Sequence, residues 1–378
     1  MKYYIIAGEA SGDLHGSNLI KALKKADPNT VVRCWGGNLM QNEGAVLVKH
    51  YRETAYMGIF EVIAHAKTIA KNFKFCYQDI IDFKPDVVIL IDYWGFNSRI
   101  ASFAKEKGIK VFYYIPPKVW VWKESRVKKI KQLIDRVFVI FPFEKDFFEK
   151  KHQLHVDYEG NPLIDSIEER KKSFGSREEF LNQHNLSNEP IIALLPGSRK
   201  QEIRYLLPIM TGLIDKYEGY QFVIAGSSSM DEHFYKQNIT NAKAKLIIDK
   251  TYELLFHATA AVVASGTATL ETALFNVPQV VCYRVFPPTY FIGNLLVSVR
   301  FFSLVNIIMN EEVVKEFMQH NLDRDITNEL SRILNDHGYK EQMLTKYSEL
   351  REKCGKPGAS KRVGELMVKY LNERASKV

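Results

Sequence analysis

Short runs of apolar residues recur along the chain, and they constrain its fold more than any other feature. Most are rich in valine and isoleucine without alternation, which is typical of parallel strands covered on both faces. Amphipathic stretches between them, such as 16–26 and 99–108, predict crossover helices. The pattern therefore predicts an α/β fold of doubly wound parallel sheets, with strands at 3–7, 86–92, 110–115, 136–141, 191–197, 221–226, 244–248, 260–265 and 279–285.

The predicted strands fall into two sets, separated by a charged stretch that has no strand-like run. The chain has 378 residues, and domains usually hold about 150, so two cores are expected. We expect one Rossmann-like domain over 1–165, a linker over 166–189, a second Rossmann-like domain over 190–345, and C-terminal helices over 346–378. One arrangement open to those helices is packing back on the first domain.

Composition is that of an ordinary globular protein, with 46% hydrophobic and 25% charged residues. The four cysteines form no C-x-x-C pair, which argues against a structural zinc site or redox work and fits a reducing compartment. The apolar run at 3–7 is too short for a signal-peptide core, so a cytoplasmic location is expected. The apolar stretch 289–309 is broken by Gly293, Asn294 and Arg300, which makes it a poor transmembrane span.

The first predicted strand runs into a glycine-rich turn, GEASGD at 8–13. The spacing of Gly8, Gly12 and Gly16 does not match the G-x-G-x-x-G fingerprint of dinucleotide sites. Glu9 and Asp13 would also place negative charge where a phosphate has to lie. The loop is therefore predicted to serve a ligand other than a nucleotide phosphate.

Basic residues gather in segment 116–136, which holds seven Lys or Arg beside Trp120 and Trp122. Such a segment suits nucleic acid, an anionic lipid surface, or simply a solvated helix face. No nucleic-acid motif accompanies it, so we rank a membrane surface above nucleic acid.

The second predicted domain carries the sharper chemistry. LLPGSR at 194–199 places Ser198 and Arg199 at the end of its first strand, where open α/β sheets bind ligands. SGTATLE at 265–271 follows another strand and starts a helix whose first N–H groups favour an anion. Ser265, Gly266, Thr267 and Arg199 thus suit a diphosphate, and Glu271, one turn further on, suits a ribose diol. Taken alone, Ser-Gly-Thr would more often be an ordinary helix cap.

Several motifs come in the order and spacing of one family, and over about residues 3–310 the chain resembles the lipid-A-disaccharide synthases, which are GT-B glycosyltransferases. These motifs are GEASGD (8–13), MGIFEV (57–62), PDVVILID (85–92), VWVW (119–122), FPFE (141–144), LLPGSR (194–199) and SGTATLE (265–271). The resemblance implies an inverting transfer between UDP-2,3-diacylglucosamine and 2,3-diacylglucosamine 1-phosphate. The products would be the β-1,6-linked lipid A disaccharide 1-phosphate and UDP.

The resemblance also implies where the enzyme works and what it needs. We expect a cytoplasmic protein that lies peripherally on the inner membrane, binds no nucleic acid and uses no cofactor, the UDP-sugar being a substrate. A homo-oligomer is left open. Neither glycine-rich turn holds an Asp-x-Asp pair of the metal-using type, so Arg199 and the helix at Thr267 are expected to hold the leaving diphosphate without metal.

Inverting transfer needs a base for the acceptor hydroxyl. Asp92, at the end of a predicted strand, is our first choice, with Glu9 and Asp13 of the opening loop as alternatives; Ser11 and Asn97 are expected to help bind the acceptor. Asp92 could instead cap the following helix, and the acids at 9 and 13 could bind backbone amides. DYWGFN at 92–97 lacks the second acid usual in the family, and IPPK at 115–118 replaces its Ser-Pro-Ser, which leaves acceptor details open.

Acylated substrates call for an apolar surface flanked by cations. We expect this surface to comprise Met57, Ile59, Phe60, Val62, Trp120, Trp122, Lys123, Arg126, Lys128 and Lys129. Two rival functions remain at this point. One is another UDP-sugar enzyme of the same fold, such as a peptidoglycan glycosyltransferase or a sugar epimerase, and the other is a non-catalytic protein that binds membranes or nucleic acid.

Overall fold

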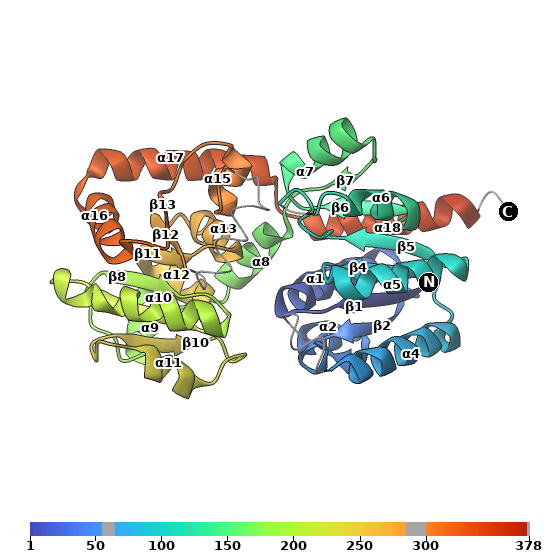
Figure 1. Cartoon of the computed structure of the whole chain (residues 1–378), viewed down its shortest axis with the longest axis horizontal. Helices are drawn as coiled ribbons and strands as arrows, with labels where there is room; N and C mark the ends of the chain where they lie inside the picture. The colour runs from blue at the N-terminus through green and yellow to red at the C-terminus, as the bar shows by residue number, and fades with distance from the viewer. Residues whose placement is uncertain (55–64, 122, 285–299, 376–378) are drawn as a thin grey trace. The chain divides into compact units, whose positions relative to one another are not determined.

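The computed structural model describes residues 1–54, 65–121, 123–284 and 300–375. The chain divides into two compact units (Figure 1). Unit 1 comprises Met1–Asp165 and Cys354–Val378, and unit 2 comprises Ser166–Lys353. The segment expected as a linker therefore belongs to unit 2, and the chain returns to unit 1 after Lys353 rather than near residue 345.

Unit 1 is built on a seven-stranded parallel sheet in the order β3-β2-β1-β4-β5-β6-β7. The order reverses between β1 and β4, which lie side by side with Ala7 opposite Ile91. Such a switch point is where doubly wound sheets open a ligand crevice. The strands are β1 (Lys2–Ala7), β2 (Val31–Gly36), β3 (Val46–His50), β4 (Val87–Ile91), β5 (Lys110–Tyr114), β6 (Arg136–Val139) and β7 (Asp157–Tyr158).

Helices follow most strands of this sheet, as parallel connections require. The C-terminal helix α18 packs on α1 so closely that a Cβ added at Gly364 would lie 2.8 Å from the Cβ of Ala22. The helices of unit 1 are α1 (Ala10–Ala26), α2 (Asn38–Asn42), η1 (Tyr51–Glu53), α4 (Ala66–Phe83), α5 (Trp94–Glu106), α6 (Arg126–Leu133), α7 (Pro142–Asp146), η2 (Phe147–Lys151) and α18 (Ala359–Ala375).

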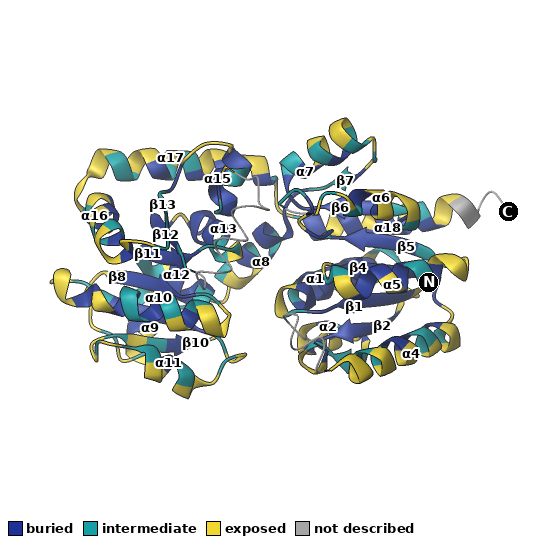
Figure 2. Cartoon of the chain, in the orientation of Figure 1, coloured by how far each residue is buried: buried dark blue, intermediate teal, exposed yellow. Residues whose placement is uncertain are grey.

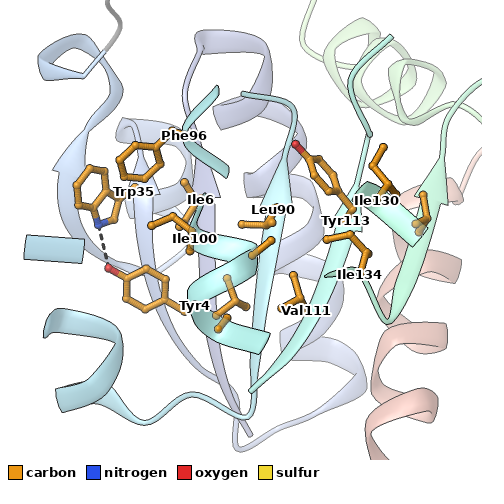
Figure 3. Packing of buried hydrophobic residues seen from close by; sticks show 14 of the residues in the cluster. Tyr4, Ile6, Trp35, Leu90, Phe96, Ile100, Val111, Tyr113, Ile130 and Ile134 are labelled. Carbon is orange, nitrogen blue, oxygen red and sulfur yellow. Dashed lines mark hydrogen bonds between the residues drawn. The ribbon is translucent and has the colours of Figure 1, made fainter. Parts of the chain in front are cut away.

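One face of this sheet packs its apolar side chains against α4, α5 and α6 (Figure 3). Tyr4 and Trp35 meet there, and the indole Nε1 of Trp35 donates a hydrogen bond of 2.9 Å to the Tyr4 hydroxyl. That hydroxyl donates in turn to Asp79 at 2.7 Å. The polar ends of these large side chains are therefore satisfied, and the core tolerates them.

Unit 2 repeats the plan with a six-stranded parallel sheet in the order β10-β9-β8-β11-β12-β13, whose switch point lies between β8 and β11. The predicted doubly wound α/β fold is thus confirmed in both units, and Figure 2 shows the strands buried beneath helices with exposed outer faces. The strands are β8 (Ile191–Leu195), β9 (Gln221–Gly226), β10 (Lys245–Ile248), β11 (Ala258–Ala264), β12 (Gln279–Tyr283) and β13 (Glu316–Met318).

The helices around this second sheet include several short ones. They are α8 (Pro162–Lys171), α9 (Arg177–Gln183), α10 (Lys200–Gly212), η3 (Ile214–Lys216), α11 (Glu232–Asn238), α12 (Thr251–His257), α13 (Thr267–Leu274), α15 (Leu304–Met309), α16 (Leu322–Asn335) and α17 (His337–Cys354). Within the described residues, no helix has both the length and the apolar character needed to span a membrane.

Candidate active site and nucleotide site

The switch point of the first sheet brings two acids to one edge. Because β1 and β4 are parallel neighbours, the residues that follow them, Glu9 and Asp92, leave the sheet at the same edge. The turn after β1 passes very close to the turn after β4, since a Cβ added at Gly8 would lie 2.3 Å from the ring of Tyr93. Glycine at this position is what lets the acidic turn approach Asp92.

The backbone at Asp92 is held in an unusual shape. Asp92 and Tyr93 have φ angles of 44° and 49°, in the left-handed region that costs a non-glycine residue roughly 1–3 kcal/mol. Hydrogen bonds fix this turn: the Asp92 carbonyl accepts from Tyr113 Oη at 2.5 Å and from Asn97 Nδ2 at 2.8 Å. The Asp92 amide donates to the Ile115 carbonyl at 3.0 Å. The strain is thus offset, and these neighbours fix the backbone that carries the carboxylate.

The chemistry of the Asp92 carboxylate fits a base. Asp92 is exposed to solvent on one side, while the protein around the other side removes part of its hydration. This burial, followed by the negative charge of Glu9, raises the pKa of Asp92 to about 6, against the opposing charge of Lys118 and a hydrogen bond from the Tyr93 amide. A carboxylate that titrates near neutral pH is a stronger base than an ordinary aspartate.

Asp13 has a different surrounding from Asp92. It is only 4% exposed, and its oxygens accept hydrogen bonds from the amides of Gly37 at 2.8 Å, Leu39 at 3.1 Å and Met40 at 3.0 Å. These amides belong to the start of α2, so Asp13 supplies the hydrogen-bond acceptor that the N–H groups at this helix terminus lack within the helix. Of the two alternatives weighed for Asp13, the structure favours hydrogen bonding to backbone amides over catalysis.

The other polar residues near this sheet edge also differ in whether they can reach a ligand. Ser11 is exposed in the first turn of α1 and can meet a ligand. Asn97 is fully buried and donates to the carbonyls of Ile91 and Asp92, so it positions the turn instead of contacting an acceptor. His15 is also buried, which lowers its pKa to about 4 and keeps the imidazole neutral.

No cluster among the described residues would hold a metal ion. The two histidines whose spacing could suggest one are engaged with carboxylates of their own surface, His152 with Glu124 at 2.9 Å and His155 with Glu149 at 2.8 Å.

The basic segment forms the helix α6 and the turn before it. Lys128 and Lys129 are exposed on α6, and Lys123 is exposed in the turn. Arg126 is half-buried, with its guanidinium 5.8 Å from the ring of Trp94. The cations predicted for a membrane surface thus include three that reach solvent.

The aromatic part of that predicted surface is less accessible. Trp120 is half-buried, packs edge-on against Phe143 with ring centroids 4.8 Å apart, and donates from Nε1 to Glu144 at 3.0 Å. Glu144 is 1% exposed and accepts from two backbone amides as well, and burial raises its pKa to about 7. Met57, Ile59, Phe60, Val62 and Trp122 lie outside the described residues.

The switch point of the second sheet gathers the nucleotide candidates. Leu195 of β8 lies opposite Val263 of β11, so the loops 196–199 and 265–267 leave the sheet side by side. Gly197 has a φ of 95°, and this left-handed residue turns the chain into α10.

The start of α10 already holds an acid. Glu202 accepts hydrogen bonds from the amides of Ser198 at 3.1 Å and Arg199 at 3.2 Å, and it pairs with the Arg199 guanidinium at 3.0 Å. Because Glu202 occupies these amides, an anion that bound here would meet the Arg199 side chain, which is 65% exposed. The sequence-based expectation that the Ser198 turn itself binds phosphate is weakened by this arrangement.

The start of α13 is more open. Thr267 is exposed, and a Cβ added at Gly266 would meet no atom of the described residues within 4 Å. The Ser265 hydroxyl is used internally, donating to the Phe302 carbonyl at 3.0 Å. The N-terminus of α13 therefore offers space, together with the helix dipole, for an anion.

Glu271 lies one turn into α13 and is half-buried. Tyr252 Oη donates to Glu271 Oε1 at 2.8 Å, and the Arg170 guanidinium stacks 5.0 Å from the Tyr252 ring centroid. Burial raises the pKa of Glu271, and the Tyr252 hydrogen bond and the Arg170 charge oppose that rise. The sequence analysis did not identify four residues that contact these sites, because no local motif marks their contacts. They are Lys118, Arg170, Glu202 and Tyr252.

A cavity of about 510 Å³ lies beside Arg170 and Tyr252. Its volume is in the range of small-molecule pockets. Asp249 and Lys250, which follow β10 at the edge where the other loops emerge, contribute to it. Its lining comprises Arg170, Ser173, Phe174, Gly175, Glu179, Phe180, Gln183, Asp249, Lys250, Tyr252 and Glu253.

Comparison with known sequences gives one consistent result. A family model described as lipid-A-disaccharide synthetase matches residues 3–366. A lipid-A-disaccharide synthase from Geobacter metallireducens is 38% identical over 378 residues, with 98% of this chain and 97% of that protein covered. Another, from Coxiella burnetii, is 34% identical over 371 residues, with 96% of each covered.

Comparison with solved structures shows the same architecture at low identity. A UDP-GlcNAc 2-epimerase from Neisseria meningitidis, bound to UDP-GlcNAc, has a TM-score of 0.68 at 15% identity, covering 98% of this chain and 100% of that one. An Anabaena protein in complex with UDP and glucose has a TM-score of 0.56 at 11% identity, covering 98% and 99%. At such identities these structures support the fold alone.

Proposed function

The chain belongs to the lipid-A-disaccharide synthase family, and we propose that the two sheet edges described above supply its donor and acceptor sites. Its fold is GT-B, with two Rossmann-like units. It is a glycosyltransferase that joins UDP-2,3-diacylglucosamine and 2,3-diacylglucosamine 1-phosphate into the β-1,6-linked lipid A disaccharide 1-phosphate and releases UDP. Its other candidate functions have no comparable support.

The donor nucleotide is placed in unit 2. In this proposal the diphosphate lies against the Arg199 guanidinium and the N-terminus of α13, where a cation and the helix dipole stabilise negative charge. Glu271 accepts hydrogen bonds from the ribose hydroxyls. The neighbouring cavity, beside Tyr252, receives the base. Two structural neighbours, one bound to UDP-GlcNAc and one in complex with UDP and glucose, support this assignment by analogy of fold.

Asp92 of unit 1 is the general base in this proposal. It removes the proton from the primary hydroxyl of the acceptor as that oxygen forms a bond to the anomeric carbon of the donor. The bond from that carbon to the diphosphate breaks, with inversion, and UDP leaves. The observation that carries the assignment is the strained, hydrogen-bonded turn that fixes Asp92 beside Glu9, with a pKa raised to about 6.

Charge that develops on the leaving diphosphate is stabilised by groups of the protein. Arg199 and the dipole of α13 supply this stabilisation in a fixed orientation, as electrostatic catalysis requires. The mechanism proposed therefore needs no cofactor, and a metal ion has no assigned role in it.

We also place the enzyme peripherally on the cytoplasmic face of the inner membrane. Its acylated substrates are lipids, and the exposed cations Lys123, Lys128 and Lys129 suit an anionic lipid surface.

The function is tested by incubating the protein with both substrates and measuring UDP release. UDP should appear only when the donor and the acceptor are both present. A sugar epimerase would convert the donor without any acceptor, and a non-catalytic binding protein would release no UDP. Either of these results would overturn the proposal.

A further inference from the structure

Glu271 is held by a second side chain before any ligand arrives. Tyr252 comes from α12, which precedes β11, and Glu271 comes from α13, which follows it. The strand between them brings the two helices together, and the phenol donates to Oε1 of Glu271 at 2.8 Å. The hydrogen bond engages one carboxylate oxygen, which directs the carboxylate relative to the edge where β8 and β11 end.

Tyr252 is itself firmly placed. It is 7% exposed, its ring lies 5.3 Å from that of Phe275, and the Arg170 guanidinium covers it at 5.0 Å. A glutamate side chain has several rotatable bonds, and fixing them when a ligand binds costs conformational entropy. A buried phenol that fixes them in advance removes part of that cost.

We infer that Tyr252 is a positioning residue for ribose recognition: its hydroxyl holds Glu271 in the orientation that accepts hydrogen bonds from the nucleotide's ribose hydroxyls. This inference rests on the proposed nucleotide site and adds a residue that does not itself contact the reacting atoms. Arg170 takes part indirectly, by stacking on the ring that carries the hydroxyl. The hydrogen bond also favours the ionised carboxylate, since it lowers the pKa of Glu271 against the effect of burial.

Removal of the Tyr252 hydroxyl should weaken nucleotide binding to an extent that depends on the 2′-hydroxyl of the sugar. We expect wild-type protein to bind UDP more tightly than 2′-deoxy-UDP in calorimetric titrations, because the deoxy sugar lacks one donor to Glu271. The Tyr252→Phe variant should lose about 10-fold of its UDP affinity, at the low end expected for a hydrogen bond to a charged group. Its affinity for 2′-deoxy-UDP should change much less, so the preference for the ribose should shrink.

Two further variants make the result specific. Tyr217→Phe is the matched control, because Tyr217 is also largely buried in unit 2 and its hydroxyl donates to the Thr327 carbonyl at 2.8 Å. This control should leave both affinities unchanged. Glu271→Gln should lose the preference for the ribose, and adding Tyr252→Phe to it should cost little more, as in a double-mutant cycle of coupled residues.

An equal fall for both nucleotides in Tyr252→Phe would show a purely structural role and overturn the inference, as would an unchanged preference for the ribose. If Glu271→Gln keeps the full preference, the proposed ribose site itself is wrong. Should Tyr252→Phe fail to fold, Arg170→Met, which removes the stacked cation and leaves the phenol, should reduce the same preference; an undiminished preference there would overturn the inference.

Discussion

The hydroxyl of Tyr113 donates a 2.5 Å hydrogen bond to the main-chain oxygen of Asp92. Tyr113 is fully buried on β5, so the turn that carries Asp92 is tied to the rigid part of the sheet. Asn97 donates to the same oxygen at 2.8 Å from α5. Side chains from β5 and α5 therefore hold the left-handed backbone of this turn, as surrounding structure must for a strained residue to persist.

Replacing Asp92 should remove most of the chemistry and little of the binding. Asp92→Asn keeps the shape of the side chain but not its basicity, so turnover should fall by roughly 10² to 10⁴-fold, the usual share of general base catalysis. UDP affinity should stay near that of wild type, because the nucleotide is assigned to unit 2. Single-turnover assays and calorimetry measure the two effects.

Glu9→Gln is the control for this prediction. Glu9 raises the pKa of Asp92 through its charge, so its replacement should alter the pH dependence and leave most of the turnover. If Asp92→Asn remains active while Glu9→Gln is inactive, the base lies in the opening loop.

The acid limb of the pH profile of kcat/KM should follow the deprotonation of Asp92. A base works only when deprotonated, so kcat/KM should rise as pH increases through about 6 and level off above it. Lys118 lowers the pKa of Asp92. Lys118→Met should therefore raise that pKa and move the acid limb to higher pH. Lys128→Met, which removes an exposed cation of α6, is the matched control, and a limb that does not move in Lys118→Met contradicts the assignment.

Asp13 should matter for stability more than for turnover. Asp13→Asn replaces a buried acceptor of three amide hydrogen bonds at the start of α2. We expect the free energy of unfolding of unit 1 to fall by about 1–3 kcal/mol, the range for a buried donor left unsatisfied. Urea denaturation followed by hydrogen exchange at Gly37 and Met40 would measure the loss. A variant of unchanged stability but abolished turnover would return Asp13 to the catalytic candidates.

Much of the fold was accessible from the sequence because buried parallel strands are continuous apolar runs. The runs at 3–7 and 86–92, for example, became β1 and β4 almost residue for residue. Two further strands of unit 1 were not predicted. The short apolar run of β2 is interrupted by Arg33, and the residues of β3 are exposed or only partly buried and include Lys49 and His50. β7 and β13 were missed because two or three residues carry too little pattern.

From the sequence, the candidate site residues could be located only by their position at the ends of predicted strands. The rule that ligands meet the carboxyl ends of parallel strands placed Asp92 and Arg199 at sheet edges. It could not show that Asp13 and Glu202 already satisfy helix amides, because both arrangements depend on side-chain rotamers. The contact between Tyr252 and Glu271 joins two helices across a strand, and no local motif signals it.

Arg199 should contribute measurably to UDP binding. Charge-assisted contacts to phosphate are worth roughly 1.5–3 kcal/mol, and the 65% exposure of the side chain favours the lower end. Arg199→Ala should therefore weaken UDP about 10-fold in calorimetry. Lys200→Ala removes a neighbouring exposed cation and should have little effect. Equal UDP affinity in wild type and Arg199→Ala would remove Arg199 from the site.

Binding to anionic vesicles should depend on α6. Each exposed lysine near an anionic surface contributes about 1 kcal/mol, and charge reversal turns that attraction into repulsion. The double variant Lys128→Glu with Lys129→Glu should therefore sediment less with phosphatidylglycerol vesicles at low salt, and added salt should release the wild-type protein as well. Lys71→Glu with Lys74→Glu makes the same change of charge at exposed positions on α4 and separates a local effect from one of net charge. If both double variants lose vesicle binding equally, the attraction depends on net charge alone. If the α6 variant binds as well as wild type, α6 is excluded as the membrane surface.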